Sequence, residues 1–225
     1  MNTDAVVWTL IGVGAVAQVV AWRLVVAGRI SVWSGTGVLM GLIGALSLAT
    51  GREHLSPKVD VVPAAAAGLA SGVALFAATR VFVRVVSSWG AFQRDTAALY
   101  RNRSSLSLPV ALFVAVGLSA PGEELFWRGL AAGRLTPVAG IFGAAAIALG
   151  GYAGVLAASE LLPIMAGAVV GGGLWSLLFV WTGGVVAGIA SHVAFTGLML
   201  VLPPRTSGSR VRPGARVRGR GGPGT

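Results

Sequence analysis

The stretch Ala120-Pro-Gly-Glu-Glu-Leu-Phe-Trp-Arg-Gly129 places two adjacent carboxylates and one arginine inside an otherwise apolar run. A charged side chain in the middle of a bilayer costs at least ~2.5 to 3.5 kcal/mol on insertion scales, so three charges this close together require a reason. On a helix, Glu124 and Arg128 are four residues apart and share a face, which allows an ion pair. Glu123 lies about 100° around the helix and lacks that partner. The pattern predicts one structural carboxylate and one carboxylate available for chemistry.

The composition around this stretch is typical of a membrane protein. Of the 225 residues, 55% are hydrophobic and only 11% are charged, whereas a soluble domain carries about 25% charged residues. The absence of cysteine excludes disulfides, Cys-ligated zinc and a thiol nucleophile. The net charge of +10 is better explained by basic cytoplasmic loops and a basic tail than by nucleic-acid binding. We therefore expect the lipid bilayer, and no nucleic acid, as a partner.

Apolar runs of about 20 residues mark the expected membrane spans. They lie at residues 6–26, 31–48, 61–79, 109–131, 137–157, 161–181 and 184–202. The sequence thus predicts an all-α polytopic membrane helix bundle of about seven transmembrane helices. Glycine pairs spaced four apart, Gly68/Gly72, Gly167/Gly171 and Gly184/Gly188, indicate tight helix packing.

Basic residues predict the orientation of the chain. Seven spans put the two termini on opposite sides, and the tail at 203–225 holds six arginines among Gly, Pro and Ser. Such a tail is expected to be disordered and cytoplasmic. The alternation then puts these basic residues on the same side: Arg29, Arg80, Arg84, Arg94, Arg101 and Arg103. We expect a multi-pass protein of a bacterial-type cell membrane with its N-terminus outside.

Three expected spans carry polar groups that could converge. Beside the two glutamates, the last span has His192 and Thr196 on one face, and the fifth contributes Tyr152. A carboxylate near an imidazole is the minimum for activating water, because the glutamate takes the proton and the histidine orients water or binds the oxyanion. The alternative is a buried polar cluster that only locks helices together, and residue types alone leave both open.

Other polar residues have simpler interpretations. Glu160 precedes the sixth span and is expected to be an interfacial carboxylate favoured by the helix dipole. His54 is expected to be a loop residue. The polar linker at 90–106 is expected to be a loop or a surface helix without chemistry. A catalytic zinc needs three protein ligands. Here that would require both glutamates and His192, and would take Glu124 from Arg128, so we expect no cofactor and keep zinc held by these three residues as the alternative.

The stretch Glu123-Glu124-Leu-Phe-Trp-Arg128, followed by Ser191-His192 in the last expected span, resembles the CPBP family of intramembrane proteases, to which the CAAX prenyl endopeptidases are related. That family carries Glu-Glu-x-x-x-Arg, then aromatic-x-x-x-His, then His-x-x-x-Asn or Asp on successive membrane helices. The resemblance covers residues 108–202 and implies that they form the protease core. Residues 1–107 then form a separate part, made of N-terminal transmembrane helices and a polar linker. It implies that Glu123 is the water-activating glutamate and that His192 is the last histidine.

The chain departs from the family pattern at two positions. The middle motif aligns with Tyr152-Ala-Gly-Val-Leu156, so Leu156 stands where the family has histidine. Thr196 replaces the final asparagine and can still donate a hydrogen bond. Leucine can neither ligate a metal nor stabilise an oxyanion, and the loss of one oxyanion donor costs other enzymes ~10² to 10³ in rate.

Three hypotheses follow. The first is an intramembrane endopeptidase that cleaves a membrane-associated or lipidated protein, with Glu123 activating water. Glu124 and Arg128 would hold that helix, while His192 and Thr196 support the transition state. The second is a catalytically inactive membrane scaffold or binding protein with the same fold. The third, a transporter that uses the carboxylates as a proton relay, fits the buried charges but explains the Ser-His pair poorly.

Overall fold

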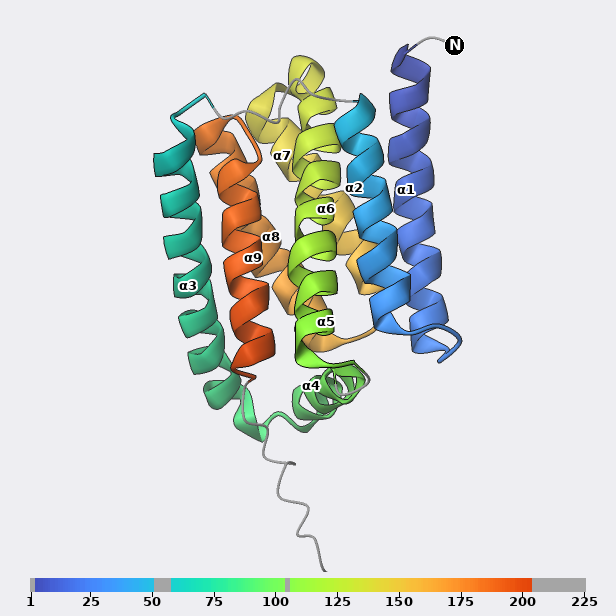
Figure 1. Cartoon of the computed structure of the whole chain (residues 1–225), viewed down its shortest axis with the longest axis vertical. Coiled ribbons are helices and arrows are strands. Elements are labelled where there is room, and N and C mark those ends of the chain that lie inside the picture. Colours follow the sequence, from blue (N-terminus) through green and yellow to red (C-terminus); the bar gives the residue numbers. More distant parts are fainter. Residues whose placement is uncertain (1–2, 51–57, 104–105, 204–225) are drawn as a thin grey trace, which may run out of the picture.

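The computed structural model describes residues 3–50, 58–103 and 106–203 as a bundle of long, roughly parallel and antiparallel helices (Figure 1). Helix α1 begins at the upper end of the bundle, and the last helix, α9, ends at the lower end. The opposite placement of these two ends agrees with an odd number of crossings. His54 and the predicted tail from residue 204 onward lie outside the described residues.

The helices match the predicted spans closely. The first three crossings are α1, the continuous pair η1 and α2, and α3, which a short turn, η2, joins to α4. The remaining helices carry the predicted core. Their bounds are α1 Thr3–Val26, η1 Trp33–Val38, α2 Leu39–Thr50, α3 Val61–Val85, η2 Val86–Ser88, α4 Gly90–Arg103, α5 Leu108–Leu112, η3 Phe113–Ser119, α6 Ala120–Glu124, η4 Leu125–Ala132, α7 Gly133–Ala157, α8 Leu162–Thr182 and α9 Val186–Val201.

One continuous helical stretch, Leu108–Ala157, is too long for a single crossing. It is interrupted at Gly140, whose φ of 67° and ψ of 164° are accessible only to glycine. The chain reverses near this residue, at the upper end of the bundle, and α7 then descends behind α6 (Figure 1). Counting this stretch as two crossings gives seven within the described residues, which confirms the predicted all-α membrane bundle of about seven helices.

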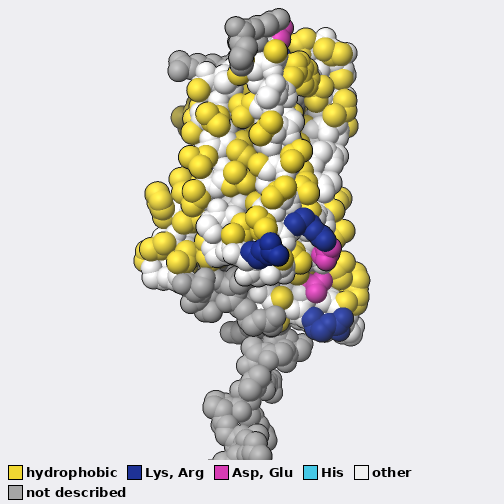
Figure 2. Space-filling view, turned by 90° about the vertical axis from the view of Figure 1, so that its right-hand side faces the viewer, with side chains coloured by type: hydrophobic (Ala, Val, Ile, Leu, Met, Phe, Trp, Pro, Cys, Tyr) yellow, Lys and Arg dark blue, Asp and Glu magenta, His cyan; other side chains and the backbone are white. Residues whose placement is uncertain are grey.

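The outer surface is apolar over most of its height. On the side formed by α1 and α2, hydrophobic side chains cover the upper and middle parts, and basic and acidic groups gather near the lower end (Figure 2). Val16 on α1 and Leu42 on α2 are more than half exposed. An exposed apolar surface of this size is expected where lipid takes the place of water. At the lower end, an ion pair joins Arg23 to Glu160.

The polar linker forms a surface helix, which is one of the two forms that the sequence predicts. Helix α4 lies at the lower end of the bundle, and the Oδ2 of its Asp95 accepts a hydrogen bond of 3.1 Å from the backbone N–H of Leu162, at the start of α8. Helix order also places Arg29, the end of α3 and the end of α9 at this lower end. The basic residues that we assigned to one side therefore do share one end of the bundle.

Helices α3 and α9 pack so closely that a side chain does not fit between them. A Cβ atom added at Gly68 or Gly72 would lie 2.3 Å from a backbone oxygen of α9, that of Ala187 or Ser191. This confirms the packing role predicted for the first glycine pair. In the second pair, a Cβ at Gly167 would meet nothing within 4 Å, so that pair does not mark a close contact.

We expect Gly72→Ala to destabilise the protein, because the new methyl group must push α3 away from α9. Overpacking of this kind costs about 1–3 kcal/mol. Gly173→Ala, in α8, is the matched control, since its Cβ would meet nothing within 4 Å. Denaturant unfolding in detergent micelles measures both variants. Equal stabilities would show that the α3–α9 contact is looser than described.

Candidate active site

The helix that carries the two glutamates is not a regular α-helix. Five α-helical residues, Ala120–Glu124, stand between two π-helical segments, η3 and η4. Pro121 gives a local reason for the first segment, because proline lacks the N–H that would close the regular bond to Gly117. π-Helical turns change the angle between successive side chains, and they occur often at functional sites. Here they lie on both sides of the two glutamates, and the second segment contains Arg128.

Glu124 is the structural carboxylate. It is completely buried, and its Oε1 accepts hydrogen bonds from Arg128 Nη1 at 3.2 Å and from His192 Nδ1 at 3.0 Å. The predicted ion pair with Arg128 is therefore present. A Cβ atom at Gly188 would lie 2.9 Å from Glu124 Oε2, so glycine at this position of α9 makes room for the carboxylate.

The Arg128 guanidinium has hydrogen-bond acceptors and aromatic rings on several sides. Its Nη2 donates to the carbonyl oxygen of Gly172 at 2.7 Å and to Ser176 Oγ at 3.3 Å, both on α8. Its guanidinium carbon lies 4.8 Å from the ring centre of Tyr152 and 5.7 Å from that of Trp175. Aromatic faces attract a cation, and the attraction is stronger where water is excluded. The buried charge is thus supported by one carboxylate, two oxygen acceptors and two rings.

His192 is fixed in orientation and in tautomer. Its ring stacks on Trp175 with centres 3.6 Å apart and planes 15° apart. Because the ionised Glu124 can only accept hydrogen bonds, Nδ1 must carry the hydrogen, and in the neutral ring Nε2 keeps a free lone pair. Thr196 lies one turn further along α9 and is half-buried.

Glu123 has a different environment from its neighbour. It is half-buried, its Oε2 accepts a hydrogen bond of 2.8 Å from the Tyr152 hydroxyl, and its Oε1 accepts one of 3.1 Å from Ser119 Oγ. Among the described residues it makes no ion pair, and no hydrogen bond joins it to His192. The two adjacent glutamates therefore differ as predicted, one paired with a cation and one held only by neutral donors.

This geometry adds contacts that the sequence-based expectations did not include. The imidazole of His192, which we expected to work beside Glu123, is hydrogen-bonded through Nδ1 to Glu124. Ser119 was missed, although its spacing of four residues from Glu123 is the same signal that revealed the Glu124–Arg128 pair. Leu156 is buried in the apolar core with only 8% of its surface exposed. Glu160 lies just before α8 and pairs with Arg23, outside the site.

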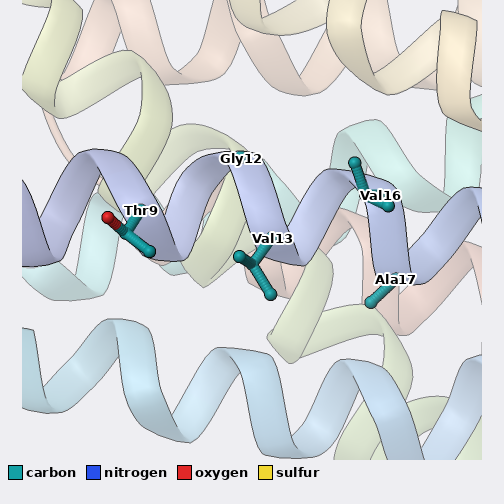
Figure 3. Close-up of a pocket in the computed structure, with 5 residues that line it drawn as sticks. All are labelled: Thr9, Gly12, Val13, Val16 and Ala17. Atoms are coloured by element: carbon teal, nitrogen blue, oxygen red, sulfur yellow. The ribbon is translucent and has the colours of Figure 1, made fainter.

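Metal ligation does not fit these residues. In the described part of the chain, no three His, Cys, Asp or Glu side chains are grouped so that they could hold a metal ion. The zinc arrangement considered above would need Glu124, whose Oε1 is already bonded to Arg128 and His192. The pocket drawn in Figure 3 is also unrelated, since it follows α1 and is lined by Thr9, Gly12, Val13, Val16 and Ala17.

Fold and site together define a multi-pass membrane protein with two adjacent carboxylates between its helices, one buried and ion-paired and one half-buried. Residues 105–198 match the family model described as type II CAAX prenyl endopeptidase Rce1-like. The chain therefore contains an Rce1-like domain of the CPBP class over this segment, which is under half of its length, and the resemblance seen in the motifs is confirmed. Neither the curated proteins nor the solved structures include a match to the chain.

The two glutamates are expected to differ sharply in their effect on stability. Glu124→Gln leaves Arg128 as an uncompensated buried charge, a change that costs about 3–5 kcal/mol in other proteins. Glu123→Gln removes no ion pair and should cost about 1 kcal/mol or less. Chemical unfolding of both variants in detergent tests the difference. The double variant Glu124→Gln/Arg128→Met should lose less than Glu124→Gln alone, and equal losses in both single variants would contradict the assignment.

Proposed function

We propose that the protein is an intramembrane endopeptidase in which Glu123 activates the attacking water. The observation that carries this proposal is the contrast between two adjacent carboxylates at membrane depth. Glu124 is neutralised by Arg128, whereas Glu123 makes no ion pair among the described residues and is held by the hydroxyl groups of Tyr152 and Ser119. Membership of residues 105–198 in an endopeptidase family supports the same reaction.

The reaction follows from general base catalysis. Glu123 takes a proton from water while the water oxygen forms a bond to the peptide carbonyl carbon. Collapse of the tetrahedral intermediate breaks the C–N bond, and Glu123 passes the same proton to the leaving nitrogen. The free Nε2 lone pair of His192 accepts a hydrogen bond from the water and orients it, and the hydroxyl of Thr196 donates to the oxyanion. No other reactant is consumed.

The substrate class follows from where the site lies. A carboxylate at membrane depth is reached by a peptide that is itself in the membrane or anchored to it by lipid. We propose a membrane protein or a lipidated peptide as the substrate. The concentration of basic residues at the lower end supports a cytoplasmic location for that end, by the positive-inside rule.

Purified protein in lipid vesicles should cleave a prenylated or transmembrane reporter peptide, and Glu123→Gln should reduce the rate by about 10² to 10⁴, the usual contribution of a general base. Mass spectrometry of the products measures the cleavage. Glu160→Gln is the matched control, because this carboxylate lies at the lower end and pairs with Arg23; it should cleave like the unmodified chain. Equal rates for Glu123→Gln and the unmodified chain would disprove the proposal.

A catalytically inactive scaffold is the second candidate, and one observation favours it. Leu156, at the position of the family's middle histidine, is packed into the apolar core. Helix α7 would then have lost a catalytic group and kept only its packing role.

Leu156→His distinguishes a decayed site from a working one. If the chain is an inactive family member, the unmodified protein should cleave nothing in a broad panel of membrane peptides, and Leu156→His should create measurable cleavage. If the chain is an active peptidase, the unmodified protein should cleave, and the buried imidazole should mainly lower stability, because an unpaired polar group in an apolar site costs about 1–3 kcal/mol. The same vesicle assay and an unfolding measurement separate the two cases.

A further inference from the structure

The position of the missing histidine is empty of hydrogen-bond donors, yet the preceding turn of the same helix supplies one. Tyr152 lies four residues before Leu156 on α7, and its hydroxyl donates to Glu123 Oε2 at 2.8 Å. We infer that Tyr152 is a positioning residue, whose phenol fixes the general base Glu123 in one orientation. This inference rests on the endopeptidase function proposed above.

The ring of Tyr152 is held too firmly for its hydroxyl to leave Glu123 easily. The side chain is 3% exposed and makes edge contacts with Trp127 and Trp175, at ring-centre distances of 6.0 and 6.4 Å. A Cβ atom at Gly172 would lie 2.9 Å from the tyrosine ring, so glycine on α8 lets the ring lie close to that helix. A rigid phenol is suited to holding another side chain in one rotamer.

The charge beside the ring helps to hold the phenol in place. The guanidinium of Arg128 faces the Tyr152 ring at 4.8 Å from its centre. A cation is attracted to the face of an aromatic ring, and the attraction is stronger where water is excluded. The hydrogen bond from the phenol to the carboxylate is charge-assisted, and it is stronger than a bond between neutral groups. The ion pair of Glu124 thus also acts on Glu123 through Tyr152.

The resulting geometry leaves Glu123 able to react. Each carboxylate oxygen can accept two hydrogen bonds. Tyr152 occupies one site on Oε2, and Ser119 occupies one on Oε1. A second site on each oxygen remains for water. When Oε1 takes the proton, Tyr152 can stay bonded to Oε2, so the base does not lose its orientation during the reaction.

Carboxyl labelling tests the contact without any need for activity. A membrane-soluble carbodiimide reacts with protonated carboxyl groups, and mass spectrometry locates the adduct on the peptide that contains Glu123. In Tyr152→Phe, Glu123 Oε2 has no phenol to displace before it reacts, so labelling should be about tenfold faster. Tyr100→Phe, at the only other tyrosine of the chain, is the matched control in α4 and should not change the rate. Glu123→Gln identifies the labelled residue.

Cleavage kinetics test the function of the contact. Tyr152→Phe should lower kcat by about tenfold to a hundredfold with little change in KM, because the ring and its packing remain and only the position of the base is affected. A purely structural role for Tyr152 would not lower kcat while leaving KM unchanged.

Each result of the labelling and cleavage experiments either supports or overturns the inference about Tyr152. Unchanged labelling in Tyr152→Phe, or unchanged kcat in a chain that cleaves, would overturn the inference. Faster labelling together with a lower kcat would support it. If labelling is faster but the unmodified chain cleaves nothing, the endopeptidase proposal fails, while the hold of Tyr152 on Glu123 is supported.

Discussion

The buried ion pair between Glu124 and Arg128 is the interaction on which the rest of the core depends. Burying two charges costs several kcal/mol per ion, and their mutual attraction repays this only if further groups satisfy them. Helix α8 supplies Gly172 and Ser176 to the guanidinium, and α9 supplies His192 to the carboxylate. With Tyr152 of α7 over the same guanidinium, the pair determines how four consecutive membrane crossings sit against one another.

The same pair accounts for the chemistry proposed for its neighbour. A single arginine cannot serve two carboxylates on different sides of one helix, so Glu124 takes the cation and Glu123 is left with hydroxyl donors. The short α-helical segment Ala120–Glu124 keeps the two side chains about 100° apart. A structural glutamate and a reactive glutamate can therefore be adjacent in the chain without competing for one partner.

The sequence predicted what depends on local spacing. The Glu124–Arg128 pair and the close approach at Gly68 and Gly72 follow from residues four apart on one helix. The partner of His192 could not be predicted, because it lies 68 residues away and the contact depends on how two helices are rotated. Two π-helical segments also alter that rotation, and nothing in residue spacing reveals their exact extent.

The N-terminal helices, which lie outside the family match at 105–198, also support the site. Ser71 on α3 shares a hydrogen bond of 3.1 Å with Ser191, which accepts another from Trp175 Nε1 at 3.3 Å. Trp175 in turn stacks on His192, so α3 helps to fix the ring that orients the imidazole. This contact requires the close packing that Gly68 and Gly72 allow. Residues 105–198 alone would therefore lack one of the contacts that fix His192, and α3 belongs to the same structural unit as the site.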